Sequence, residues 1–212
     1  MQELSMLIKT LGALGTNCYL IMNEESKEAI IIDPPSHGNV IEGILTAKEF
    51  IPKAILLTHG HADHMGAVEM LREVYPSIPV YASELERELL LNPEWNLSRM
   101  LGPAKISLEA DVYLKDGEML SFLGTEIKCI STPGHTQGGM CYYFKDMNWL
   151  FSGDTLFEGS VGRTDFPTGS AATLVRSIKE KLFELSEDTM VYPGHGAPTG
   201  IGIEKQSNPF LE

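Results

Sequence analysis

Cysteine is scarce in this sequence of 212 residues, with three copies at Cys18, Cys129 and Cys141. The three lie far apart and form no Cys-x-x-Cys pair, so the sequence excludes a disulfide framework and a thiolate zinc site. Isolated cysteines in odd number are typical of reduced thiols in a protein core. We therefore predict three free, buried cysteines.

Basic residues are also few, with 16 Lys and Arg against 29 Asp and Glu and a formal net charge of −13. Because a phosphate backbone is bound by concentrated positive charge, this composition excludes nucleic acid as a partner. No apolar run approaches the roughly 18 residues of a membrane span, and the first residues, MQELS, do not resemble a signal peptide. We predict a cytoplasmic protein with no membrane partner. The sequence does not indicate its oligomeric state.

Short apolar or alternating runs come in two groups, each followed by helical patterns. The expected strands are 6–11, 17–22, 29–32, 53–58, 118–122, 126–131, 140–144, 149–152 and 189–192, and the expected helices are 40–50, 65–75 and 171–185. Residues 83–101, with Trp95 and Met100, have an irregular helical pattern, which we interpret as a lid or substrate wall. This order predicts an α/β fold of the αββα sandwich type, with two mixed β-sheets and helices on the outer faces. We expect one domain over residues 1–212.

Three of the six histidines fall within THGHADH, residues 58–64, directly after the apolar run 54–57. Imidazole and carboxylate groups are the usual protein ligands of zinc, iron and manganese. His59 and His61 can reach one ion from an extended loop, whereas Asp63 and His64 have no room at that ion. The cluster therefore predicts two metal ions side by side.

Three later strands end in turns that carry a histidine or an aspartate beside glycine. These turns are STPGHT at 131–136, SGDT at 152–155 and YPGHG at 192–196. Flanking glycines let the backbone turn sharply and approach a ligand closely. Five of the six histidines thus stand at strand ends, and His37, in a proline-rich loop, is expected to be solvated or to pack within the loop.

Read in order, THxHxDH, TPGHT, SGD and PGH resemble the metal-binding motifs of the metallo-β-lactamase superfamily, from the first strands to about His195. The resemblance implies metal ligands at His59, His61, Asp63, His64, His135, Asp154 and His195. It assigns His59, His61 and His135 to one ion. It assigns Asp63, His64 and His195 to the other, with Asp154 bridging the two. Zinc β-lactamases tend to have Cys at the position of Asp154, which disfavours a lactamase.

The resemblance also implies a chemistry for the site. Two divalent ions about 3.5–4 Å apart, zinc in the first place with iron or manganese as alternatives, would activate a shared water. The catalytic groups would then be Asp63 and Asp154 with a metal-bound hydroxide. The sequence has no Gly-x-Ser-x-Gly elbow, no catalytic Cys-His signature and no Walker loop. We therefore predict a binuclear metallohydrolase.

Polar residues next to the motifs are candidates for orienting the ligands. Thr58 and Thr136 could hydrogen-bond liganding imidazoles. Asp33 ends a strand before two prolines and could do the same, but we interpret it as a turn residue.

Within the superfamily the closest resemblance is to glyoxalase II, the hydroxyacylglutathione hydrolase, through GDTLF at 153–157. It implies a small-molecule thioester substrate such as S-lactoylglutathione. Arg163 stands where glyoxalase II has a substrate-binding lysine, and it could hold a carboxylate or pair internally with Asp165. Residues 196–212 are too few for the C-terminal helical domain of classical glyoxalase II. In this the chain resembles short bacterial glyoxalase II-like hydrolases that end in Asn-Pro-Phe, as 208–210 do.

Two other reactions stay open. Persulfide dioxygenases share the fold and the segment GRTDF, here 162–166, and use one iron with ligands at the positions of His59, His135 and Asp154. Their last motif usually reads Ala-His-Asp-Tyr, whereas this chain has GHGA at 194–197. A diiron redox module of the flavodiiron kind is a remote alternative, because such modules normally carry a flavin domain and a carboxylate among the first ligands.

Overall fold

The amino-terminal half of the chain builds the first of two sheets. The computed structural model describes residues 4–101 and 105–212, and within them this sheet has six strands in the spatial order β1-β2-β3-β4-β5-β6. They are β1 (Leu4–Leu11), β2 (Thr16–Asn23), β3 (Glu28–Ile32), β4 (Ile51–Leu56), β5 (Val80–Ser83) and β6 (Val112–Leu114). The first three pair antiparallel, and β3 to β6 pair parallel, so the sheet is mixed.

The second sheet has the order β14-β13-β10-β9-β8-β7 among the described residues. Its strands are β7 (Met119–Phe122), β8 (Thr125–Ser131), β9 (Met140–Phe144), β10 (Trp149–Gly153), β13 (Met190–Pro193) and β14 (Thr199–Gly200). A parallel pairing of β10 with β13 makes this sheet mixed as well, since its other pairs are antiparallel. The short strands β11 (Leu156–Phe157) and β12 (Ser160–Val161) form a separate ribbon.

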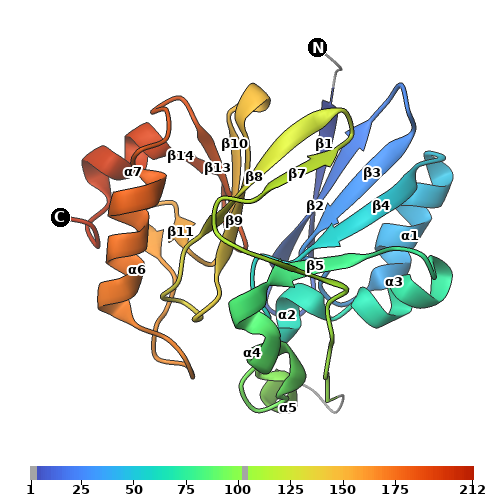
Figure 1. Cartoon of the computed structure of the whole chain (residues 1–212), viewed down its shortest axis with the longest axis horizontal. Helices are drawn as coiled ribbons and strands as arrows, with labels where there is room; N and C mark the ends of the chain where they lie inside the picture. Colours follow the sequence, from blue (N-terminus) through green and yellow to red (C-terminus); the bar gives the residue numbers. More distant parts are fainter. Residues whose placement is uncertain (1–3, 102–104) are drawn as a thin grey trace.

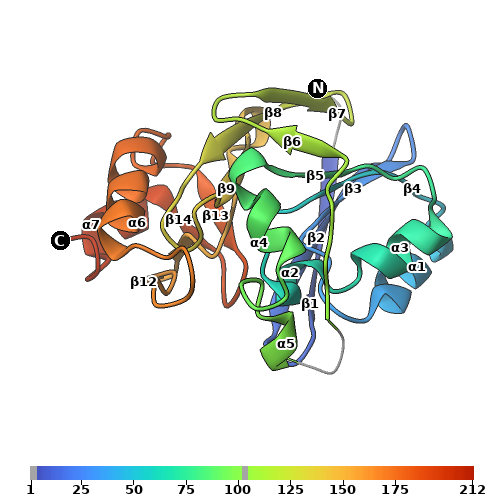
Figure 2. The same ribbon diagram turned by 60° about the horizontal axis from the view of Figure 1, so that its bottom comes forward.

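Helices cover the outer faces of both sheets, as Figure 1 shows. On the first sheet lie α1 (Gly38–Ala47) and α3 (Val68–Val74), and on the second lie α6 (Ala171–Ser177), a π-helical turn (Ile178–Leu182) and α7 (Ile201–Ser207). At one edge of the sandwich are α2 (Ala62–Met65), α4 (Arg87–Leu91) and α5 (Ser98–Leu101), with α5 beside α2 in both views (Figures 1 and 2). Two 3-10 turns complete the elements, Glu84–Glu86 and Lys145–Met147.

The core consists of three apolar layers, which follow from the alternation of side chains along the strands. In β8, for example, Ile127 and Cys129 face the other sheet, while Ile130 faces the helices. Residues of β2, β3 and β4 meet those of β8, β9 and β10 in the central layer. The αββα sandwich predicted from the order of the elements is therefore confirmed, and the three cysteines are free and buried as predicted.

Several element predictions were wrong in detail. Strands β5 and β6 were missed because they are only four and three residues long and depend on parallel neighbours for their hydrogen bonds. The single helix expected at 65–75 is two helices, α2 and α3, separated at Gly66 and Ala67. The helix expected at 40–50 ends at Ala47, and α7 was not predicted.

Within the part of the chain that the structure describes, no helix has the length and apolar character needed to cross a membrane.

Candidate metal centre

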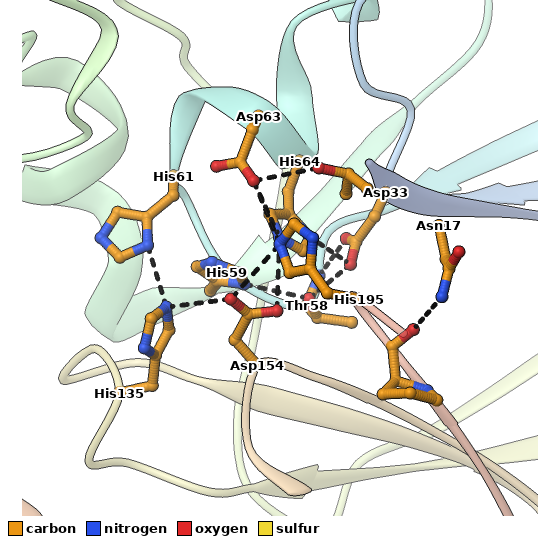
Figure 3. Close-up of polar contacts among 12 residues, drawn as sticks. Asn17, Asp33, Thr58, His59, His61, Asp63, His64, His135, Asp154 and His195 are labelled. Carbon is orange, nitrogen blue, oxygen red and sulfur yellow. Dashed lines mark hydrogen bonds and ion pairs between the residues drawn. The ribbon is translucent and has the colours of Figure 1, made fainter. Parts of the chain in front are cut away.

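The histidines and aspartates singled out from the sequence lie together at one edge of the sandwich (Figure 3). His59 and His61 follow β4, and Asp63 and His64 belong to the short helix α2. The others follow β8, β10 and β13 in the second sheet, at His135, Asp154 and His195. Strands β8, β10 and β13 run in the same direction, so the turns after them reach the same edge.

Asn17, at the start of β2, holds the last histidine turn against the first sheet. Its backbone N–H donates to the Gly194 carbonyl at 2.7 Å, and its side-chain amide donates to the carbonyls of Pro193 at 3.1 Å and Gly196 at 3.0 Å. His195 is therefore positioned by a strand of the other sheet. Sequence reasoning missed Asn17, because nothing in its local pattern indicates partners so far along the chain.

Three histidines form the first half of the cluster. His59, His61 and His135 are each 2–3% exposed. The His135 Nδ1 donates to the carbonyl of Arg163 at 2.7 Å, which turns Nε2 toward the cluster, 3.0 Å from Nδ1 of His61. Burial, together with the neighbouring imidazoles, lowers the pKa of His59 well below its usual value and that of His61 to about 3. Both rings are thus neutral at pH 7 and offer lone pairs.

The second half of the cluster is built around His64. Its Nδ1 donates to Asp33 Oδ2 at 2.9 Å, so Nε2 faces the cluster, 3.3 Å from Nε2 of His195. Asp63 Oδ2 lies 3.2 Å from the same His195 nitrogen and accepts a hydrogen bond from Thr16 at 3.0 Å. Burial by itself would lower the pKa of His64, but the surrounding carboxylates of Asp63, Asp154 and Asp33 raise it to about 10.

The interpretation of Asp33 as a simple turn residue was wrong. Asp33 is 1% exposed and, besides His64, accepts from the Thr58 backbone at 2.7 Å and the Thr58 hydroxyl at 2.6 Å. Asp33 therefore orients the imidazole of His64. The Thr58 hydroxyl also lies 3.2 Å from His59 Nδ1, in agreement with the role expected for Thr58. Thr136 is buried, and His37 is exposed as predicted.

Asp154 lies between the two halves (Figure 3). Its Oδ1 is 3.4 Å from Nε2 of His64, and its Oδ2 is 3.6 Å from Nε2 of both His135 and His195. The Asp154 carboxylate can lie here because residue 194 is glycine, since a Cβ at Gly194 would lie 2.3 Å from Asp154 Oδ1. One carboxylate therefore faces histidines of both halves.

The cluster has the properties of a metal site. Its ligand atoms fall into three sets, each within 4.8 Å: His59, His61 and His135; His59, His64 and Asp154; and Asp63, His64 and His195. Among the described residues, His59 Nε2, His61 Nε2 and Asp154 Oδ1 are buried without a hydrogen-bond partner, which a protein seldom tolerates unless another group satisfies them. Imidazole nitrogens beside carboxylate oxygens are a donor set that suits divalent cations, so these residues fit a pair of ions.

A cavity of about 610 Å³ opens over the cluster. Its lining includes Arg163 and a set of apolar side chains, Leu14, Leu97, Met100, Leu101, Phe157, Val161 and Phe166. The segment 83–101 thus contributes residues to the wall through its last turn, although Trp95 is not among the lining residues. A second cavity of about 250 Å³ adjoins it and shares Leu14, Asp63 and Leu101.

Arg163 forms the internal pair that sequence analysis left open. Its Nε and Nη2 donate to the two carboxylate oxygens of Asp165, each at 2.7 Å, and its guanidinium lies over the ring of Phe166 at 3.9 Å. The Arg163 and Asp165 side chains are 58% and 67% exposed, so a substrate carboxylate could still compete for the guanidinium. A role in substrate binding stays a prediction.

Comparison with known proteins finds a match over residues 11–195 to the family model described as metallo-beta-lactamase superfamily. The chain is 38% identical to a probable metallo-hydrolase, YqgX, of Bacillus subtilis, and 36% identical to the hydroxyacylglutathione hydrolase GloC of Haemophilus influenzae, covering 94% of both chains in each case.

Two solved structures are similar along their whole length. The structure named BLEG-1 B3 metallo-beta-lactamase has a TM-score of 0.91 at 40% identity, over 98% of this chain and 99% of that one. The structure of TTHA1623 in a di-iron-bound form has a TM-score of 0.85 at 36% identity, over 97% of this chain and 100% of the other.

Proposed function

Because the chain belongs to the metallo-β-lactamase superfamily and is a metallo-hydrolase, we propose that it hydrolyses thioesters of the S-lactoylglutathione type with two divalent metal ions. The observation that carries the proposal is the position of Asp154 between two histidine sets, from which it would serve both ions. His59, His61 and His135 would hold one ion, and Asp63, His64 and His195 the other. We propose zinc, and iron is the alternative that the di-iron relative suggests.

Two cations bound there would lower the pKa of water toward about 7 and polarise the substrate carbonyl. The protein's part is to hold the geometry. Asp154 sets the spacing of the two halves, and Asp63, held by Thr16, faces the cavity above them. Both carboxylates would help to orient the attacking water, and the short distances from their oxygens to the His195 nitrogen support this role.

The lining of the cavity supports a thioester whose thiol arm carries a carboxylate. Arg163 is the cation on its wall, and a guanidinium can bind a carboxylate with two hydrogen bonds. Leu97, Met100 and Phe166 provide apolar surface for the rest of the substrate. The likeness to a hydroxyacylglutathione hydrolase points to the same class of substrate.

The proposal is tested by metal analysis combined with an activity assay. We expect two divalent ions per chain in protein purified without chelator, and hydrolysis of S-lactoylglutathione that proceeds in the absence of oxygen. Asp154→Ala should lose one ion or both and all measurable turnover, because the shared carboxylate is gone. Full activity in this variant would reject the two-metal arrangement. If the protein instead held one iron per chain and consumed oxygen with glutathione persulfide, its reaction would be dioxygenation rather than hydrolysis.

A β-lactam amide is the second substrate class to assay, because a 40% identical structure is named a B3 metallo-beta-lactamase. The same cation pair could in principle open a strained amide as well as a thioester. We expect nitrocefin to be hydrolysed at least 100-fold less efficiently than S-lactoylglutathione, as judged by kcat/KM. A larger kcat/KM for nitrocefin would reassign the function to β-lactam hydrolysis.

A further inference from the structure

Glu86 carries a carboxylate that is entirely buried although it belongs to none of the metal-binding motifs. It is the last residue of the 3-10 turn Glu84–Glu86 and is 0% exposed. Within the residues that the structure describes, no lysine or arginine offsets its charge. A buried carboxylate without a cationic partner is costly and uncommon, so its surroundings need explanation.

Both oxygens of Glu86 accept hydrogen bonds from backbone N–H groups of metal-binding loops. Gly60, which stands between His59 and His61, donates to Oε2 at 2.7 Å. Gly138, three residues after His135, donates to Oε1 at 2.8 Å. Glu86 therefore connects the two loops, one from each sheet, that carry the three-histidine half of the centre.

The packing around these two glycines leaves room for little besides the carboxylate. A Cβ at Gly60 would lie 2.8 Å from Leu89 and 2.9 Å from Leu90, and a Cβ at Gly138 would lie 2.6 Å from the Glu86 backbone nitrogen. The two loops are thus pressed against the segment that carries Glu86. Because its two backbone partners are N–H groups, both side-chain oxygens act as acceptors, which a carboxylate can provide and an amide, with its single oxygen, cannot.

We propose that Glu86 is a positioning residue for the three-histidine half of the centre, which its carboxylate holds in register by joining the loops of His59–His61 and His135. The proposal rests on the two-ion centre proposed above. The other half has separate supports, since Asp33 orients His64 and Asn17 holds the turn of His195. Loss of Glu86 should therefore affect one ion and spare the other.

Glu86→Gln tests this half-specific effect. The amide keeps the shape of the side chain but turns an NH₂ group toward one of the two N–H donors. We expect one of the two zinc ions to bind about 10–100-fold more weakly, as other changes around metal ligands do, while the second ion keeps its wild-type affinity. The measurement is zinc retained by the purified holoprotein against increasing concentrations of a competing chelator.

Glu204→Gln is the matched control. Glu204 is also buried, at 1% exposed, and also accepts from a backbone N–H, that of Gly159 at 3.0 Å, and from the Thr199 hydroxyl at 2.6 Å. These partners lie in the turn between β11 and β12 and in β14, outside the turns 152–155 and 192–196 that carry Asp154 and His195. We expect Glu204→Gln to lower thermal stability about as much as Glu86→Gln and to leave both zinc affinities unchanged.

Unchanged affinity for both ions in Glu86→Gln would overturn the proposal, and so would an equal weakening of both ions. If the variant does not fold, amide hydrogen exchange on the wild-type holoprotein decides instead. Gly60 and Gly138 should then be protected, and exchange at the rate of exposed amides would refute the proposed role. Fewer than two ions in the wild type would reject the two-ion centre. The exchange measurement would still test separately whether Glu86 holds the two loops.

Discussion

Gly194→Ala is expected to disable the metal centre by adding one methyl group. The new Cβ would lie 2.3 Å from Asp154 Oδ1 and 2.6 Å from His64 Cε1, whereas real Cβ contacts are essentially never under 3.0 Å. The carboxylate must therefore withdraw by about 0.7 Å, the difference between 3.0 and 2.3 Å. Metal–ligand distances tolerate changes of only about 0.2 Å, so a shared ligand cannot keep both ions after such a shift.

The effect should be steric and local. Gly194 is not among the glycines with positive φ, so alanine can adopt its backbone conformation. We expect the variant to fold, to lose at least one of two zinc ions and to show kcat/KM for S-lactoylglutathione reduced by about 100-fold or more. The readouts are metal content, circular dichroism and initial rates.

Gly43→Ala is the control, because a Cβ at Gly43 in α1 would meet nothing within 4 Å. It should keep wild-type zinc and activity and gain about 0.5–1 kcal/mol of stability from the better helix propensity of alanine. A Gly194→Ala protein with full zinc content and wild-type turnover would refute the close approach of Asp154, and with it the shared-ligand geometry.

Three further outcomes are expected. Asp33→Ala should weaken the binding of one ion by about 10–100-fold and destabilise the metal-free protein by about 3–5 kcal/mol in urea, because it removes the buried acceptor of His64 Nδ1 and of the Thr58 N–H and hydroxyl. A loss under about 1 kcal/mol would contradict this. Metal-free protein should be most stable near pH 6.5. As the pH falls below 6.5, His61 takes up a proton in the unfolded chain but not in the folded protein, where its pKa is about 3, so stability falls. As the pH rises above 6.5, His64 loses its proton in the unfolded chain but keeps it in the folded protein up to its pKa of about 10, so stability falls again. Denaturation midpoints that still rise from pH 7 to 9 would argue against this. Leu101→Asp should raise KM several-fold at unchanged kcat, since Leu101 lines both cavities. An unchanged KM would show that Leu101 is not part of the substrate-binding wall.

Much of the centre could be inferred from the sequence because its ligands follow strand ends, where local patterns are informative. The motifs around His59, His135, Asp154 and His195 each combine an apolar run, a glycine and a ligand residue. Such a pattern identifies candidate donor residues and the points where the chain turns, whereas their assignment to two ions was implied by the resemblance to the metallo-β-lactamase superfamily.

The tertiary structure alone decided which other polar groups serve the centre. Asp33 was interpreted as a turn residue, and Asn17 and Glu86 were not considered, yet each hydrogen-bonds a ligand or a ligand-bearing loop. Their partners come from distant parts of the chain, and nothing in the local sequence indicates which distant N–H or carbonyl group will lie beside a given side chain. The sequence determines which atoms can bind metal, because that is a property of residue type. The orientation of those side chains depends on hydrogen bonds that form only when the two sheets pack together, so the tertiary structure decides it.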